Sequence, residues 1–330
     1  MTAVPSFAHG RPRLGPQSRK WIDRLSTIGI FLVIMLLMQA LSPGFITVAN
    51  LNLIMLQAAT RAILAIGMML VIVSGGIDIS CGTVMSLCMV LFGVGVIDGG
   101  VPLYAGFLLA ILAGAFVGSL NGAVIAWAGL PPFIVTLGML GIAQGLALLI
   151  SNGRSVYGFP ESFEFFGGGT IMGVPVAVVI LAGFALVMLF VFHQTRLGRY
   201  AFAIGGNEEA TRRAGIDVRL WKIAIYATMG ATAGLAAIVL ASRINSAHPG
   251  IGYGYELDAI AAVVIGGGSL RGGRGSVWGA IIGALIMSEI RFGLNVLGMS
   301  PFIQQIVVGV ILIAAVWLDT LRTPANSRGK

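Results

Sequence analysis

Ten apolar stretches follow one another along this chain, and all but one are at least 17 residues long. A helix of about 20 residues crosses the ~30 Å hydrocarbon core of a bilayer, so stretches of this length predict membrane-spanning helices. The eighth stretch is too short to cross as a regular helix. The ten lie at residues 25–41, 51–73, 80–97, 102–127, 132–150, 172–193, 220–242, 258–267, 276–297 and 302–318.

The composition points to the same class of protein. Of the 330 residues, 57% are hydrophobic and 10% are charged, whereas about 25% of the residues of a soluble domain are charged. This excludes a disordered chain, a disulfide-rich secreted scaffold and a cytosolic enzyme. The apolar runs also lack the alternation of a lipid-facing β-barrel. We therefore predict an all-α polytopic membrane protein with about ten transmembrane helices, one of them short or broken.

The positive charges indicate how the chain is oriented. Basic residues gather before the first apolar stretch, between residues 196 and 222, and after the last stretch. Since basic loops stay in the cytoplasm, we expect a cytoplasmic tail at 1–24, a transmembrane domain at 25–320 with a cytoplasmic loop at 194–219, and a cytoplasmic tail at 321–330. All but four of the 20 Lys and Arg residues then face inward. There is no basic stripe with interleaved aromatic residues, so nucleic-acid binding is not expected.

Small residues are placed where helices could approach closely. Glycines spaced four residues apart at 114–122 and 275–283 favour packing between helices of one chain, with a subunit interface as the alternative. The pairs Gly75-Gly76 and Gly266-Gly267 stand in similar surroundings and suggest a weak internal repeat. Cys81 and Cys88 would lie about 10 Å apart on one helix, too far for a disulfide, so we expect two buried thiols.

The loop at 194–219 contains a short polar helix at 207–214. Asn207 suits the N-cap, acids occupy the first turn and arginines the last, which favours the helix dipole. Gly215 then suits the position just past the helix end. The alternative is a solvated connector. The residues of interest here are Asn207, Glu208, Glu209, Ala210, Arg212, Arg213 and Gly215.

Several reaction types have no support in the sequence. None of the lysines Lys20, Lys222 and Lys330 lies between a glycine and a Ser or Thr, so the chain has no phosphate-binding loop for ATP hydrolysis. The three histidines are well separated and no Cys/His cluster exists, so no metal site and no catalytic constellation are expected. The glycine-rich stretch at 266–275 is typical of irregular backbone between two half-helices.

The ionisable residues within apolar stretches need partners or a route to water. Glu289 and Arg291 would point about 160° apart on one helix, so we expect no pair between them. Arg61 is expected to reach the outer surface by extending its side chain, and the acids Asp98, Glu161, Glu164, Glu256 and Asp258 are expected outside. Asp78 and Ser80 are expected to cap the third helix.

Several motifs are shared with one family of transport proteins. Glu209-Ala210-Thr211, followed by Gly215, resembles the Glu-Ala-Ala…Gly loop of bacterial ATP-binding-cassette (ABC) importer permeases, although Thr211 replaces an alanine and the distal Leu-Pro is absent. Further stretches resemble the ribose-type sugar permeases: Gly-Gly-Ile-Asp-Ile-Ser at 75–80, Pro-Pro-Phe-Ile-Val-Thr-Leu-Gly at 131–138, Gly-Tyr-Glu-Leu-Asp-Ala-Ile-Ala-Ala-Val at 254–263 and Gly-Gly-Arg-Gly-Ser at 272–276. The resemblance extends from about residue 25 to 320.

This resemblance implies a multi-pass permease subunit of an ATP-driven, binding-protein-dependent sugar importer in a bacterial inner membrane. Separate ATPase subunits would bind Mg-ATP, so the chain itself would need no cofactor. A periplasmic sugar-binding protein would deliver the solute, and a second permease copy, identical or paralogous, would complete the dimer. The helix at 207–215 would be the coupling helix that fits the ATPase, with Glu209, Ala210 and Gly215 carried over from the family motif.

A neutral, hydroxyl-rich solute needs amide and hydroxyl side chains along its path. The candidates in or near apolar stretches are Asn121, Gln144, Glu289, Asn295 and Gln304, each of which could instead serve helix packing. A related permease for a polyol, a sugar-like signal, a nucleoside or an amino acid stays open as an alternative. An ion-coupled secondary carrier is a weaker alternative because the stretches contain few acids and no evident coupling-ion site.

Overall fold

The computed structural model describes residues 16–322, with side chains from residue 28 to residue 320. These residues form thirteen helices and one two-stranded hairpin, so the all-α prediction holds apart from the hairpin. The predicted tails fall largely on residues outside the described range. The elements are α1 (Pro16–Leu41), α2 (Val48–Val73), α3 (Cys81–Ile97), α4 (Leu103–Trp127), α5 (Pro132–Ile150), α6 (Glu161–Gly168), β1 (Thr170–Ile171), β2 (Val174–Pro175), α7 (Val176–Gln194), α8 (Arg196–Gly206), α9 (Glu208–Arg213), α10 (Val218–Ile244), α11 (Tyr255–Ile265), α12 (Val277–Val296) and α13 (Pro301–Arg322).

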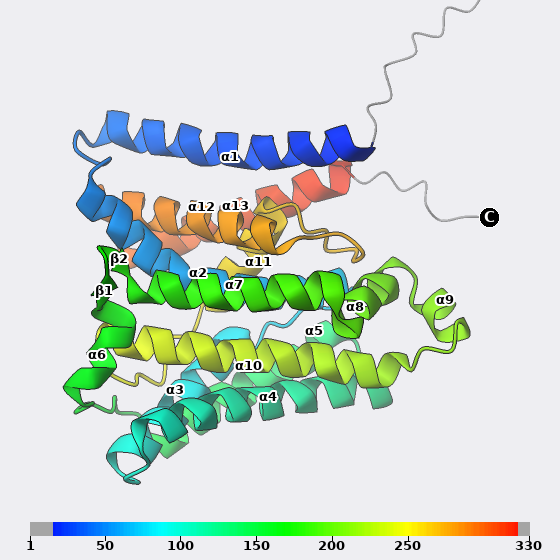
Figure 1. Cartoon of the computed structure of the whole chain (residues 1–330), viewed down its shortest axis with the longest axis horizontal. Coiled ribbons are helices and arrows are strands. Elements are labelled where there is room, and N and C mark those ends of the chain that lie inside the picture. The colour runs from blue at the N-terminus through cyan, green and yellow to red at the C-terminus, as the bar shows by residue number, and fades with distance from the viewer. Residues whose placement is uncertain (1–15, 323–330) are drawn as a thin grey trace, which may run out of the picture.

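The long helices run side by side along one axis of the molecule (Figure 1). Within the described residues, seven helices are long and apolar enough to cross a membrane, namely α2, α4, α5, α7, α10, α12 and α13. The shorter apolar helices Ile28–Leu41 (within α1) and α3, together with the 11-residue α11, account for the other three predicted stretches. At 1.5 Å per residue, α11 is only about 16 Å long, so the short eighth stretch is confirmed.

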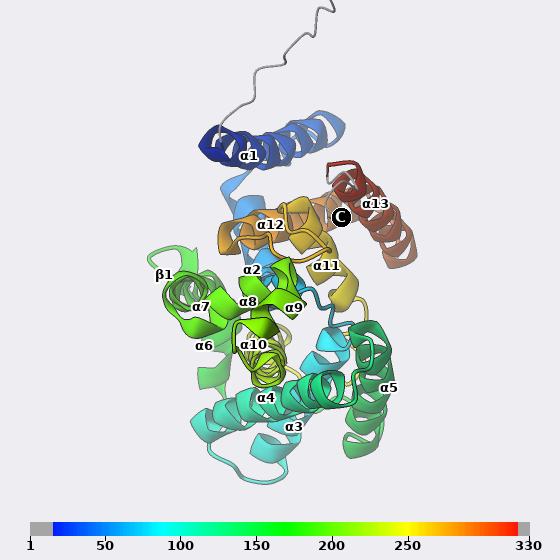
Figure 2. The same ribbon diagram turned by 90° about the vertical axis from the view of Figure 1, so that its right-hand side faces the viewer.

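Helix α2 lies near the centre of the bundle (Figure 2). Every residue from Ala58 to Val73 is buried, and α10 and α12 both pack against this helix. The outer helices α1, α5 and α13 instead expose large apolar side chains such as Leu36, Leu149 and Ile313. Exposed apolar surface on this scale is typical of a face that meets lipid or another subunit.

Glycines allow two helix pairs to pack backbone against backbone. On α4, a Cβ added to Gly118 would lie 2.1 Å from the carbonyl oxygen of Tyr226 on α10. On α12, a Cβ added to Gly283 would lie 1.9 Å from the carbonyl oxygen of Ala262 on α11. Both glycine ridges are therefore confirmed as contacts between helices of one chain.

The two ends of the bundle carry different elements (Figure 1). Helices α8 and α9, the first turn of α1 and the last turn of α13 lie at one end, which we name the α9 end. Helix α6 and the hairpin lie at the opposite end, the α6 end. The hairpin occupies residues that we expected to begin a helix at 172. Met172 and Gly173 have φ angles of 50° and 82°, which a right-handed helix cannot include, so α7 begins only at Val176.

Candidate functional site

Helices α8 and α9 form the polar loop at the α9 end. Asn207 ends α8 and begins α9, and its Oδ1 accepts a hydrogen bond from the N–H of Ala210 at 2.9 Å. Past the helix, Gly215 has a φ of 82° and its N–H donates to the carbonyl of Arg212 at 3.0 Å. The short helix and both of its caps are therefore as predicted.

The outward face of α9 is charged and exposed. Glu208 accepts a hydrogen bond from Arg212 at 3.1 Å, and Glu209 pairs with Arg213 one helical turn later. The side chains of Glu209 and Arg213 are 74% and 78% exposed. Exposed pairs of this kind contribute little to stability. They instead present an ordered charged surface that a partner protein can contact.

The inward face of α9 is attached to the bundle. Glu208 is half-buried at the edge between the two faces, and its Oε2 lies 2.8 Å from Nζ of Lys222 on α10. Thr211 is buried, and its hydroxyl donates to the carbonyl of Asn207 at 2.8 Å. The residue at which the loop departs from the family pattern thus faces the protein. The substitution at Thr211 therefore does not alter the outward face of α9.

Two half-helices begin inside the protein, each next to a buried acid. Oδ1 of Asp78 accepts hydrogen bonds from the N–H and the hydroxyl of Ser80 at 2.9 and 2.6 Å, just before α3. Both carboxylate oxygens of Glu256 accept from the N–H of Gly254 at 3.0 Å, at the start of α11. The two starts are adjacent, because a Cβ on Gly82 would lie 2.3 Å from Oε2 of Glu256. The acids satisfy free N–H groups and the positive end of each helix dipole.

Only part of the expected capping at α3 is confirmed. Asp78 satisfies the N–H of Ser80, the N-cap residue, whereas the hydroxyl of Ser80 makes no cap bond to the helix. That hydroxyl instead lies between Asp78 and Asn121, donating to the former and accepting from Nδ2 of the latter at 3.0 Å.

A buried ion triad joins three helices. Asp258 of α11 is 1% exposed. Its Oδ2 accepts from Nε of Arg61 on α2 at 2.9 Å, and its Oδ1 accepts from Nη2 of Arg291 on α12 at 2.6 Å. The guanidinium of Arg61 also lies 5.4 Å from the ring centre of Tyr255. Three charges held together in this way tie α11 to both of its neighbours.

The triad corrects two expectations. Arg61 does not extend to the outer surface, and Asp258 and Glu256 do not lie on it, because α11 carries both acids into the interior. Pairing within the protein offsets the cost of removing these charges from water. The expectation that Arg291 does not pair with Glu289 is confirmed. The sequence carries no local signal for the triad, since Arg61 and Asp258 are 197 residues apart.

The five pathway candidates do not meet at one place. Asn121 is fully buried, and its Oδ1 has no hydrogen-bond partner among the described residues. Gln144 is half-buried and donates to the carbonyl of Pro249 at 3.2 Å. Glu289 is fully buried, and neither carboxylate oxygen has a partner within the described range. Asn295 is exposed, and Gln304 donates to the carbonyl of Met299 at 3.2 Å.

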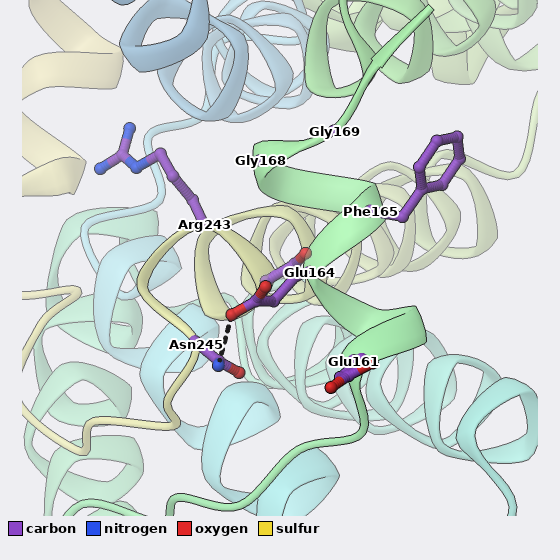
Figure 3. A pocket seen from close by; sticks show the side chains of 8 residues that line it. Glu161, Glu164, Phe165, Gly168, Gly169, Arg243 and Asn245 are labelled. Carbon is purple, nitrogen blue, oxygen red and sulfur yellow. Dashed lines mark hydrogen bonds between the residues drawn. The ribbon is translucent and has the colours of Figure 1, made fainter.

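An open cavity of about 480 Å³ lies at the α6 end, between α6 and the end of α10 (Figure 3). Glu164 accepts a hydrogen bond from Nδ2 of Asn245 at 2.9 Å, and the side chain of Arg243 points away from both. None of the pathway or coupling candidates lines this cavity. Elsewhere, the described residues contain no group of His, Cys, Asp and Glu suited to a metal ion, and Cys81 and Cys88 are buried thiols, as predicted.

The sequence is similar to known membrane permeases. The family described as "Branched-chain amino acid transport system / permease component" matches residues 50–316. The chain is 40% identical to the ribose import permease protein RbsC of Escherichia coli, over 92% of this chain and 95% of RbsC. It is 36% identical to the D-allose transport system permease protein AlsC of Escherichia coli, over 91% and 92% of the two chains. It is 34% identical to the autoinducer 2 import system permease protein LsrD of an Enterobacter species, over 86% and 90%.

No solved structure matches the chain. The family match covers most of the residues, and the relatives align over nearly their whole lengths. The chain therefore belongs to the branched-chain amino acid and sugar permease family of bacterial ABC importers, as a multi-pass membrane component that is not itself an ATPase.

Proposed function

We propose that this chain is the permease subunit of an ATP-driven importer for a sugar of the ribose type. The observation that carries the proposal is the 40% identity to a ribose import permease across 92% of the chain. A permease named for D-allose, another polyhydroxy sugar, is almost as similar. Both solutes are neutral and rich in hydroxyl groups, so a path for them needs hydrogen-bonding side chains rather than fixed charge.

The proposed coupling element is α9. Separate ATPase subunits would dock on its exposed face, where Glu209, Arg212 and Arg213 lie. Closure of those subunits on ATP would push a short rigid helix, and such a helix passes on a rigid-body displacement. The permease would then alternate between states that open toward opposite sides of the membrane.

The α9 end is the proposed cytoplasmic side. The start of α1 and the end of α13 both lie on this side (Figure 1). Its basic residues agree with the preference of Lys and Arg for cytoplasmic loops, whereas the α6 end carries the exposed acids Asp98, Glu161 and Glu164. A periplasmic binding protein would deliver the sugar at the α6 end.

A second permease copy, identical or paralogous, is part of the proposal. The sides of α5 and α13 expose apolar residues such as Ile134, Leu137 and Ile306, which a second copy can cover as well as lipid can. Asn121, Gln144, Glu289, Asn295 and Gln304 stay candidates for the sugar path. In the conformation described they do not form one continuous polar surface.

The test is reconstitution with the co-purified ATPase and binding protein in liposomes. We expect ATP-dependent uptake of labelled D-ribose or D-allose, with autoinducer 2 as the sugar-like alternative. Uptake of leucine or uridine but of none of the sugars would contradict the proposed solute class. Accumulation by the chain alone, driven by an ion gradient without nucleotide, would favour the secondary carrier.

A further inference from the structure

Three segments of backbone meet at the α9 end with no side chain between them. The carbonyl oxygen of Val73, the last residue of α2, accepts a hydrogen bond from the N–H of Gly273 in the α11–α12 loop at 2.8 Å. The last turn of α8 covers this bond. A Cβ on Gly205 would lie 1.9 Å from the Val73 oxygen and 2.8 Å from the Gly273 nitrogen. Since interiors are close-packed, any side chain at residue 205 would have to displace backbone.

The loop adds glycines of its own to this contact. Gly272 has a φ of 82°, and a Cβ there would lie 2.8 Å from the carbonyl oxygen of Gly205. Gly273 has a φ of 72°, and a Cβ there would lie 3.3 Å from Cα of Gly206. Positive φ angles strongly favour glycine. We name Val73, Gly205, Gly272 and Gly273 the glycine junction.

The glycine junction adjoins both places where a helix is interrupted. At the end of α2 the N–H of Gly76 donates to the carbonyl of Val71 at 3.1 Å, and at the end of α11 the N–H of Gly268 donates to the carbonyl of Val263 at 2.8 Å. In both, the preceding glycine has a positive φ. Gly75-Gly76 and Gly267-Gly268 therefore form the same type of helix end, so the second pair of the weak repeat, Gly266-Gly267, lies one residue before the equivalent position. After α2 the chain turns into the interior, where α3 begins. Helix α11 begins in the interior and leads the chain back to the α9 end.

Helix α9 is closely connected to the glycine junction. A single residue, Asn207, separates α8 from α9. Its N–H donates to the carbonyl of Ala203 at 3.0 Å, and its Oδ1 caps α9. Gly205 lies in the same last turn of α8, two residues before this shared cap. There is no flexible linker between the exposed charged helix and the junction.

We propose that Gly205 is a positioning residue for transport, through which a displacement of α9 moves the α2–α3 and α11–α12 interruptions as one body. The inference rests on the proposed coupling role of α9. A contact between backbones contains no rotatable side chain, so a small shift on one side is not absorbed by a change of rotamer. The inner starts of α3 and α11, with their buried acids Asp78 and Glu256, would follow the junction.

Gly206 provides a matched control for a test by substitution. It is the next residue of the same helix, and a Cβ there would meet no atom within 4 Å. Gly205→Ala and Gly206→Ala therefore change helix propensity alike. Only Gly205→Ala brings a Cβ against the backbone of Val73 and Gly273. Each variant is purified with its ATPase and binding protein and reconstituted in liposomes with D-ribose as the solute.

We expect the Gly205→Ala complex to keep its ATPase subunits and hydrolyse ATP while the D-ribose imported per ATP falls about tenfold, a typical size for conformational coupling. Gly206→Ala should match the wild type. Equal transport per ATP in the two variants would overturn the proposal.

A distance measurement covers the case in which Gly205→Ala fails to assemble. Because Cys81 and Cys88 are buried, spin labels can be attached at Ala214→Cys beside α9, Arg274→Cys beside the junction and Glu161→Cys at the α6 end, all of them exposed positions. Between nucleotide-free and ATP-vanadate states of the complex, the 214–274 distance should stay constant while the 214–161 distance changes. A 214–274 distance that changes as much as the other, or the absence of change in both, would overturn the proposal.

Glu209→Lys separates a failure of the junction from a failure of the proposed function. If Glu209→Lys leaves D-ribose uptake and ATP coupling intact, the coupling role of α9 fails. If Glu209→Lys uncouples transport and Gly205→Ala does not, the role of Gly205 alone fails.

Discussion

Asp258 on α11 and Arg291 on α12 are joined by a 2.6 Å ion pair between Oδ1 and Nη2, and their side chains are 2% and 19% exposed. The other carboxylate oxygen of Asp258 pairs with Arg61 on α2 at 2.9 Å. One acid thus serves two cations. Its neutralisation leaves two positive charges in the interior, where an unpaired charge is far more costly than in water.

Asp258→Asn should therefore destabilise the protein strongly. Breaking a buried pair typically costs about 3–5 kcal/mol, so we expect a large fall in the melting temperature of the detergent-purified protein and in its yield. Asp98→Asn, at an exposed acid after α3, is the control and should melt like the wild type. A melting temperature of Asp258→Asn within a degree or two of the control would show that the triad does not hold α11.

Glu289→Gln should have the opposite outcome. Glu289 is fully buried, and neither of its carboxylate oxygens has a hydrogen-bond partner among the described residues. Burying an unpartnered charge is costly, whereas a neutral amide of the same shape is tolerated. We expect unchanged or higher thermal stability and preserved uptake, measured beside Asp258→Asn, which makes the same chemical change. Loss of uptake in a well-folded Glu289→Gln protein would instead place this residue on the sugar path.

Glu209→Lys should uncouple transport from ATP hydrolysis without affecting insertion. Its side chain is 74% exposed on α9 and its only described charged partner is Arg213. Reversing this charge alters the proposed docking face. The double variant Glu209→Lys/Arg213→Glu restores the pair within α9 with reversed polarity and is the control for local unfolding. Recovery of ATP-coupled uptake in the double variant would mean that helix stability, not docking, explains the single variant.

Gly118→Ala and Gly138→Ala should affect the stability of the protein in opposite directions. A Cβ on Gly118 would lie 2.1 Å from a backbone oxygen of α10, whereas one on Gly138 of α5 would meet nothing within 4 Å. Overpacking costs about 1–3 kcal/mol, and Gly→Ala at an open helix position gains up to about 1 kcal/mol. We expect a lower melting temperature for Gly118→Ala and an equal or higher one for Gly138→Ala. Equal melting temperatures would contradict the close α4–α10 contact.

Local residue patterns account for the features of the fold that can be predicted from the sequence. The ten apolar stretches correspond to helices, and the eighth is short. They can be recognised because a membrane-crossing helix requires one continuous run of apolar residues. The helix at 207–214 is where Asn207, its flanking charges and Gly215 place it, because caps and dipole contacts act within a few residues. The hairpin at 170–175 was missed, since its turn depends on the φ angles of two residues inside an apolar run.

The sequence by itself determined the class of protein, the order of its helices and the position of α9. Only the tertiary structure decided that Arg61 reaches Asp258, 197 residues away, and that Gly205 is enclosed while Gly206 is not. Hydrophobicity, caps and charge bias are properties of neighbouring residues, whereas ion pairs and backbone contacts depend on how distant helices cross. The spacing and type of Arg61, Asp258 and Gly205 in the sequence do not show how their helices cross.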